Sequence, residues 1–345
     1  MNVKPESNFP LWIKHLADVS VIWLLIIFYR LNPYYFNFLN QNTQFVLFCF
    51  ALTTTFLGWI NYYFRPQAES KVLTAALGLR RLAGEFRLYL SSFGKEKIIE
   101  TPAWTPKEKV AILFMLVKIF FVPLMLNFAV INYLNLISHF QTLTLYDSSR
   151  PVEFFNQFLY GAGLEILFFI DTAFFCFGYL FEADFLDNEV RSVDPTWLGW
   201  FVALACYPPF NEVTGKFIPG YNSDYPLFVD NIWLTTGIRM MILILILIYA
   251  AASVALGPKA SNLTNRGVVT YGPYAFVRHP AYITKNLAWF LGTLPVFGVY
   301  SILSSLGIGF VYFLRAITEE RHLSQDPDYQ AYCQKVKYRF IPGIY

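Results

Sequence analysis

Long runs of apolar residues, separated by shorter polar segments, extend along most of the chain. About eight of them are long enough to cross, or nearly cross, the ~30 Å of hydrocarbon in a bilayer. They occupy residues 17–31, 44–64, 110–134, 155–181, 197–210, 232–256, 282–298 and 300–317. The pattern predicts an all-α protein, a polytopic bundle of about eight transmembrane helices. The fifth run is short and ends at Pro208 and Pro209, so we expect it to be tilted, broken or re-entrant.

Basic residues are distributed unevenly between the segments that separate these runs. With the N-terminus placed in the cytosol, 21 of the 26 Lys and Arg residues lie on the cytosolic side, three lie outside and two lie within the runs. Segments rich in Lys and Arg stay in the cytosol during membrane insertion. The distribution therefore predicts an integral, multi-pass membrane protein with both termini in the cytosol.

Composition supports this prediction and excludes other classes of protein. The chain of 345 residues is 56% hydrophobic and only 14% charged, whereas soluble domains are about a quarter charged. A net charge of +3 is too small to indicate a nucleic-acid partner. The four cysteines lack the spacing of metal ligands, so we expect neither a disulfide framework nor a metal site. The first apolar run has no small-residue cleavage site and is expected to remain uncleaved.

Residues 1–255 carry no recognisable functional motif, but three of their features favour particular structures. Residues 72–90 have helical apolar spacing with interspersed basic residues, which predicts an amphipathic helix on the cytosolic leaflet or one packed on the protein itself. Four ionisable residues lie inside apolar runs, where they either join helices or line an acceptor cavity. These residues are Lys118, Glu165, Asp171 and Arg239. Segment 182–194 is interpreted as a solvated loop and segment 206–210 as a helix terminus, in preference to catalytic features.

Residues 266–282 have a different character from the apolar runs on either side. Gly267 and Gly272 permit a close approach of backbone to ligand, and Pro273 stiffens the turn. Pro280 suits the first turn of the following helix, whose free N–H groups favour an anionic ligand group. This mixture of residues indicates a binding loop between two membrane helices.

A second polar motif follows the last apolar run. Arg315 and Glu319 are four residues apart and share one face of the predicted helix. One interpretation is a surface salt bridge at the membrane interface, and the other is a pair of ligand contacts. The sequence leaves both open.

Together these motifs resemble the isoprenylcysteine carboxyl methyltransferase and phospholipid methyltransferase superfamily of integral-membrane enzymes. The family pattern is a Gly-x-Tyr-x-x-x-Arg-His-Pro-x-Tyr block, a transmembrane hairpin, Arg-x-x-x-Glu-Glu-x-x-Leu and a Tyr-x-x-Tyr tail. Its counterparts here are Gly272 to Tyr282, Arg315 to Leu323 and Tyr329 to Tyr332. The resemblance covers about the last 85 residues. This sequence departs from the pattern at Thr284, where the family has Gly, and at Gln325-Asp326, where the family has Phe-Gly.

The resemblance implies an S-adenosyl-L-methionine-dependent methyltransferase whose cofactor-binding core is residues 256–345, with residues 1–255 as a transmembrane region of unassigned function. It implies that ten residues contact the cofactor: Arg266, Gly267, Val268, Val269, Tyr274, His279, Pro280, Ala281, Tyr282 and Glu319. Arg315 matches a position that contacts the methyl acceptor, and Lys259 lies near another cofactor position. Arg315 and His279 are the candidate catalytic residues. For His279, binding and structural support are favoured over action as a general base.

The acceptor implied by the resemblance is a membrane lipid or a lipid-anchored group. The guanidinium of Arg315 suits a carboxylate or a phosphate, and the sequence does not choose between them. Two other classes remain as alternatives. Residues 338–345 are similar to the C-terminus of sterol-reductase-type enzymes, which use a reduced nicotinamide cofactor, and the charges within the runs are compatible with a non-enzymatic transporter or lipid-binding protein.

Overall fold

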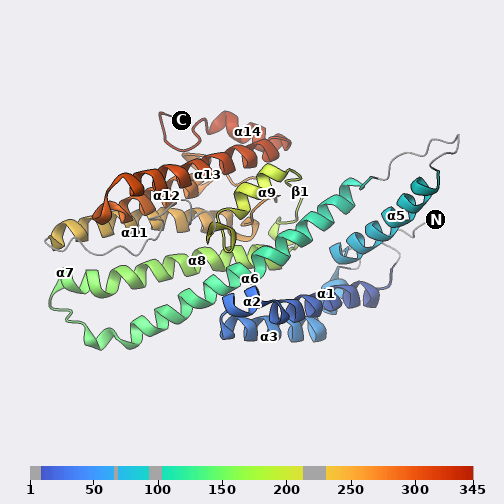
Figure 1. Ribbon diagram of the computed structural model, residues 1–345, viewed down its shortest axis with the longest axis horizontal. Helices are drawn as coiled ribbons and strands as arrows, with labels where there is room; N and C mark the ends of the chain where they lie inside the picture. Colours follow the sequence, from blue (N-terminus) through green and yellow to red (C-terminus); the bar gives the residue numbers. More distant parts are fainter. Residues whose placement is uncertain (1–8, 66–68, 93–102, 213–230, 345) are drawn as a thin grey trace. The chain divides into compact units, whose positions relative to one another are not determined.

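The computed structural model describes residues 9–65, 69–92, 103–212 and 231–344, which are predominantly helical (Figure 1). The chain divides into two compact units, Met1–Asn127 and Phe128–Tyr345. The described strands are β1 (Ser192–Val193) and β2 (Thr264–Asn265), which pair antiparallel over two residues each. The predicted all-α polytopic fold is confirmed.

The first unit is built from helices that exchange buried polar contacts. They are α1 (Leu11–Leu31), α2 (Pro33–Phe38), α3 (Gln41–Leu57), α4 (Trp59–Phe64), α5 (Lys71–Ser92) and the first part of α6 (Pro106–Gln141). The Tyr29 hydroxyl donates to the Ile119 carbonyl at 2.7 Å, and the Thr43 hydroxyl donates to the Asn127 side chain at 2.9 Å. Each hydrogen bond provides a partner for a polar group that would have none in the hydrocarbon of a bilayer.

The helix expected at residues 72–90 is present as α5, and its two halves differ. The first half is packed on the protein, with Leu73 and Ala75 buried. The Arg81 guanidinium binds Glu108 at the start of α6, with Nη2 and Oε2 2.5 Å apart. The second half exposes Phe86. Both expected arrangements of this helix therefore have support, each over one half of its length.

The second unit consists mainly of apolar helices, several of them long. Its helices are the end of α6, α7 (Pro151–Phe154), a π-helical turn at Phe155–Leu159, α8 (Tyr160–Leu180), α9 (Trp197–Leu204), α11 (Ile232–Leu256), α12 (Pro280–Gly292), α13 (Val299–Leu323) and α14 (Pro327–Lys335). Short 3₁₀ turns lie at Leu143–Leu145, Asp184–Leu186, Gly257–Lys259, Gly272–Ala275 and Leu294–Val296. A core cluster of Ile242, Ile246, Tyr249 and Ala288 joins α11 to α12. The outer side of α11 exposes Met241, Ile244 and Leu247, which suits contact with lipid.

Helices α8 and α11 run in the same direction. Near their starts, Arg239 of α11 lies over the ring of Tyr160 of α8, with 4.5 Å between guanidinium carbon and ring centroid. At their ends, Gly178 of α8 contacts the backbone of Ala260, which follows α11. Because the two helices are parallel, the chain has to return from one end of the unit to the other between Leu180 and Ile232, and α9 begins this return.

Five helical segments among the described residues are long and apolar enough to cross a membrane: Leu11–Leu31, Pro106–Gln141, Pro151–Leu180, Ile232–Lys259 and Val299–Leu323. The other three apolar runs form shorter helices. The run at 44–64 is divided into α3 and α4 at Gly58, and α9 and α12 have 8 and 13 residues. At 1.5 Å per residue these last two span about 12 Å and about 20 Å. The count of about eight crossings, and the cytosolic position of both termini, stay predictions.

The ionisable residues within the apolar runs form contacts between helices. The His139 Nδ1 lies 2.7 Å from a Glu165 carboxylate oxygen, and Arg239 donates to the Asn156 carbonyl at 2.7 Å. In the first unit, the Lys118 amino group lies 4.7 Å from the centroid of the Phe114 ring on its own helix, and it attracts the Asp18 carboxylate of α1. Asp171 is buried and accepts hydrogen bonds from Tyr249 and Ser253, both on α11. Of the four, Asp171 is the one bonded to residues that line the pocket described below.

The close contact at Gly178 generates a stability prediction. A Cβ atom at this position would lie 2.1 Å from the Ala260 carbonyl oxygen, so Gly178→Ala has to separate α8 from the loop after α11. We expect the free energy of unfolding to fall by about 1–3 kcal/mol, measured by thermal unfolding of the detergent-purified protein. Gly237→Ala on α11 is the matched control, because a Cβ there meets no atom within 4 Å. Equal stability of the two variants would contradict the packing.

Candidate active site

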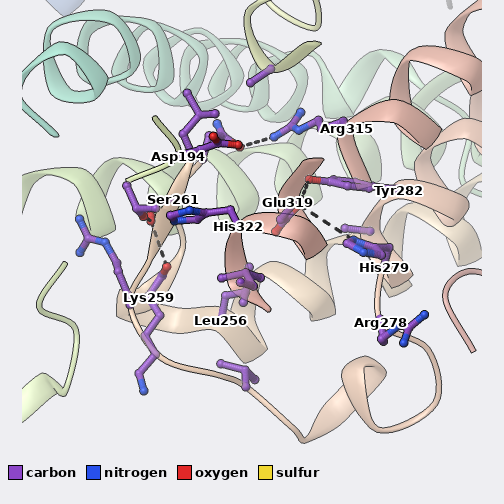
Figure 2. A pocket seen from close by; sticks show the side chains of 18 of the residues that line it. Asp194, Leu256, Lys259, Ser261, Arg278, His279, Tyr282, Arg315, Glu319 and His322 are labelled. Atoms are coloured by element: carbon purple, nitrogen blue, oxygen red, sulfur yellow. Dashed lines mark hydrogen bonds and ion pairs between the residues drawn. The ribbon is translucent and has the colours of Figure 1, made fainter. Parts of the chain in front are cut away.

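One pocket in the second unit gathers nearly all of the residues that the sequence motifs predict (Figure 2). Its empty space, including the open mouth, is about 1340 Å³. Ten of the eleven predicted residues line it: Arg266, Gly267, Val268, Val269, Tyr274, His279, Ala281, Tyr282, Arg315 and Glu319. Pro280 is the exception, because it is buried as the first residue of α12 and does not reach the pocket. Lys259 also lines the pocket, and its amino group binds Asp187 at 2.7 Å.

The loop before α12 is held in shape by its own glycines and by the C-terminal tail. Gly267 and Gly272 have φ of +89° and +62°, a region that favours glycine. The backbone N–H groups of Arg278 and His279 donate to the Tyr338 and Arg339 carbonyl oxygens at 3.0 and 2.9 Å. The tail therefore fixes the backbone that presents His279.

Two neighbouring glutamates on α13 have different surroundings. Glu320 contacts two guanidinium groups and one imidazole: Arg278 Nε at 3.0 Å, Arg339 Nη2 at 2.7 Å and His279 Nε2 at 3.1 Å. Glu319 is more exposed and accepts a hydrogen bond of 2.5 Å from the Tyr282 hydroxyl. Glu320 thus fastens loop, helix and tail together, while Glu319 presents a carboxylate to the pocket.

His279 lies between these two carboxylates. Its Nδ1 is 4.0 Å from Glu319, and its ring stacks on Tyr282 with centroids 5.1 Å apart (Figure 2). The His279 side chain is buried, and Nε2 is already bonded to Glu320. This geometry suits a binding and positioning role better than proton transfer.

Arg315 is buried in the pocket wall and makes no surface salt bridge. Its guanidinium donates to the Asn262 side chain and lies over the rings of Tyr207 and Tyr282, at 5.6 and 5.1 Å from their centroids. Among the described residues no ion pair joins Arg315 to Glu319, although the two share a helix. The interpretation of this pair as an interfacial salt bridge is therefore wrong.

The tail motif closes the pocket near the loop. Tyr329 and Tyr332 of α14 are buried pocket residues, and the Tyr332 hydroxyl donates to the Tyr274 carbonyl at 2.8 Å. Asp326, where the sequence departs from the family pattern, caps α14 and accepts hydrogen bonds from Asn265 and Arg191 at 2.8 and 3.0 Å. Partial burial opposes the charge on Asp326, but these hydrogen bonds outweigh it and lower the pKa of this carboxyl. At this departure from the family pattern, Asp326 thus joins α14 to β2 and to Arg191.

The segment before α9 is part of the site, which the sequence did not indicate. Strand β1 pairs with β2 of the loop, with Ser192 opposite Asn265 and Val193 opposite Thr264. Asp194 is buried and lines the pocket, so its interpretation as part of a solvated loop is wrong. No motif marks it, because a pairing of two residues per strand leaves no periodic signal.

The end of the pocket formed by membrane helices was also not predicted. Lys285 of α12 and Tyr249 and Ser253 of α11 line it. The Tyr249 hydroxyl donates to Asp171 at 2.5 Å and lies 3.4 Å from the Lys285 amino group. The only sequence signal for this cluster was the carboxylate of Asp171 within an apolar run.

Comparison with known proteins matches part of the sequence that forms the pocket to a family model. Residues 233–325 match the model of the isoprenylcysteine carboxyl methyltransferase (ICMT) family, whereas no curated protein and no solved structure matches the chain. The match runs from α11 to the residues that follow α13 and so includes the loop, both glutamates and Arg315. The match confirms the resemblance drawn from the motifs to the ICMT family; the tail motif, Tyr329 to Tyr332, follows the matched residues.

Proposed function

We propose that this protein is an integral-membrane methyltransferase that uses S-adenosyl-L-methionine and acts on a lipid or lipid-anchored acceptor. The observation that carries the proposal is that the loop, α13 and tail motifs, which are up to 66 residues apart in the sequence, meet around one pocket. The loop and α13 motifs lie within the residues that match the ICMT family model. Neither a non-enzymatic transporter nor a lipid-binding protein requires this convergence.

The polar and aromatic side chains of the pocket fit the chemical groups of the cofactor. His322 is 5% exposed and lines the pocket, and its Nδ1 has no hydrogen-bond partner within the part of the chain that the structure describes. A buried polar atom of this kind is costly unless a ligand satisfies it. Glu319 offers a carboxylate for hydroxyl or ammonium groups, and Tyr329 and Tyr332 offer ring faces for a base or a cation.

Methyl transfer requires the protein mainly to align the acceptor with the methyl group of the cofactor. S-adenosyl-L-methionine, when bound, supplies a methyl group already activated on a sulfonium centre. The task left to this chain is to hold an acceptor in line with that group and to exclude water. Arg315, fixed by Asn262 and by aromatic rings, is suited to hold an anionic acceptor in one orientation. An acceptor that is already ionised needs no general base, which agrees with the bonded state of His279.

Equilibrium binding to the detergent-purified protein tests the proposed class. We expect S-adenosylhomocysteine to bind and a reduced nicotinamide dinucleotide phosphate not to bind, measured by calorimetric titration. The opposite preference would establish the reductase alternative raised by the tail. Binding of neither would contradict both enzyme classes.

Substitutions of the two glutamates of α13 are predicted to have different effects, one on ligand affinity and the other on stability. Glu319→Gln removes the carboxylate that faces the pocket, so we expect affinity for S-adenosylhomocysteine to fall by roughly 10-fold or more with little change in stability. Glu320→Gln weakens three charge-assisted contacts, so we expect a stability loss of roughly 1–3 kcal/mol. Titration and thermal unfolding of both variants distinguish the roles. A Glu319 variant with wild-type affinity would remove this residue from the cofactor site.

Arg315 is predicted to affect the acceptor and not the cofactor. Arg315→Lys keeps the charge but loses the planar fork of donors, and we expect acceptor binding to weaken by roughly 1–3 kcal/mol. Methyl-transfer kinetics in membranes, with acceptor and cofactor varied separately, measure the two effects. An unchanged acceptor dependence would show that Arg315 does not contact the acceptor.

A further inference from the structure

The part of the pocket formed by α11, α12 and α13 contains a second cation beside Arg315, Lys285, that no family motif includes. Lys285 lies one helical turn after Tyr282 on α12 and lines the same pocket as Arg315. Its amino group lies over the rings of Tyr249 and Trp289, at 4.8 and 5.0 Å from their centroids. A lysine within a bundle of membrane helices is costly and is usually retained for a function.

Neither of the two cations forms an ion pair with any residue that the structure describes. Arg315 donates to the neutral side chain of Asn262, and Lys285 makes one long hydrogen bond of 3.4 Å to the Tyr249 hydroxyl. The two side chains line the same pocket, and each lies over an aromatic ring that contacts Tyr312: Tyr282 for Arg315 and Trp289 for Lys285. An isolated pair of like charges of this kind is stabilised when an anion lies between them.

Asp171 does not remove the need for an anion. It attracts Lys285 across the cluster, but its oxygens accept hydrogen bonds from Tyr249 and Ser253, and it makes no ion pair with Lys285. A lysine that served only to join helices would bind this carboxylate directly. Instead, the Tyr249 hydroxyl lies between them, donating to Asp171 and accepting from Lys285, and this chain orients the amino group.

The charge of the methyl donor strengthens the argument. A sulfonium centre adds positive charge to a pocket that already contains Arg315 and Lys285. The Glu319 carboxylate offsets part of this charge, and an acceptor with negative charge offsets more of it. On this basis, and resting on the proposed methyltransferase function, we propose that Lys285 and Arg315 together bind an anionic group of the acceptor, a carboxylate or a phosphate.

The test measures acceptor binding separately from cofactor binding. Wild-type protein, Lys285→Met and Lys285→Arg are saturated with S-adenosylhomocysteine and titrated with N-acetyl-S-farnesyl-cysteine, its uncharged carboxamide, and vesicles of phosphatidylcholine with or without phosphatidic acid. Lys109→Met is the matched control, because it removes the same charge from an exposed position in the first unit. Thermal unfolding of each variant reports whether it keeps its fold, and affinity for S-adenosylhomocysteine reports whether it keeps the cofactor site.

We expect wild-type protein to prefer an anionic probe to its uncharged counterpart, and Lys285→Met to weaken that binding by roughly 10-fold to 100-fold. Lys285→Arg should retain most of the affinity, and Lys109→Met should equal wild type. Selective binding of the carboxylate identifies a lipid-anchored acid, and selective binding of phosphatidic acid identifies a phospholipid head group.

Three results would overturn the inference. The first is unchanged preference for the anionic probe in Lys285→Met, and the second is wild-type protein that binds S-adenosylhomocysteine but prefers neither anionic probe. The third is an equal loss of S-adenosylhomocysteine affinity in Lys285→Met and Lys285→Arg, which would assign Lys285 to the cofactor. Wild-type protein that does not bind S-adenosylhomocysteine would instead remove the proposed function, and the inference with it.

Discussion

The candidate site depends on one carboxylate that binds two guanidinium groups and an imidazole. Glu320 contacts Arg278, His279 and Arg339, which come from the loop, the start of α12 and the C-terminal tail. A loop outside the membrane has few apolar contacts with which to hold a fixed shape, so charge-assisted hydrogen bonds have to do so. The positions of the His279 ring and of Tyr282 stacked on it follow from this arrangement.

The pocket changes character along its length. The loop and α14 contribute backbone, histidine and tyrosine groups, which suit a polar ligand near water. The membrane helices contribute Tyr249, Tyr312, Arg315 and Lys285, an aromatic wall with two cations. An amphiphile has the matching distribution, with a charged head beside an apolar chain. This agreement connects the membrane fold to the choice of a lipid-type acceptor.

The sequence predicted those parts of the structure that leave a local signal. Apolar runs marked the long helices, and the motifs that contain Tyr274, His279, Arg315 and Glu319 marked residues that the fold brings to one pocket. Pro280 was misplaced because its role is to begin a helix, and a residue that shapes a loop looks the same in sequence as one that touches a ligand.

Residues that reach the pocket through distant contacts were not predictable. Asp194 arrives through the pairing of β1 with β2, and Asn262 becomes relevant only because Arg315 lies beside it in space. Lys285 was counted among cytosolic charges, since the sequence does not show that α12 turns this side chain toward Tyr249. In each case the signal is a contact between separate elements and not a pattern within one.

The pairing of β1 with β2 also limits how residues 256–345 can be transplanted. Residues 256–345 contain every family motif, yet a fragment that starts there lacks the strand that pairs with Thr264 and Asn265. It also lacks Asp194, Tyr207 and Tyr249 from the pocket wall. A chimaera that grafts this region onto another membrane scaffold therefore has to carry α8, α9 and α11 with it, so the smallest exchangeable module is about twice as long as the motifs indicate.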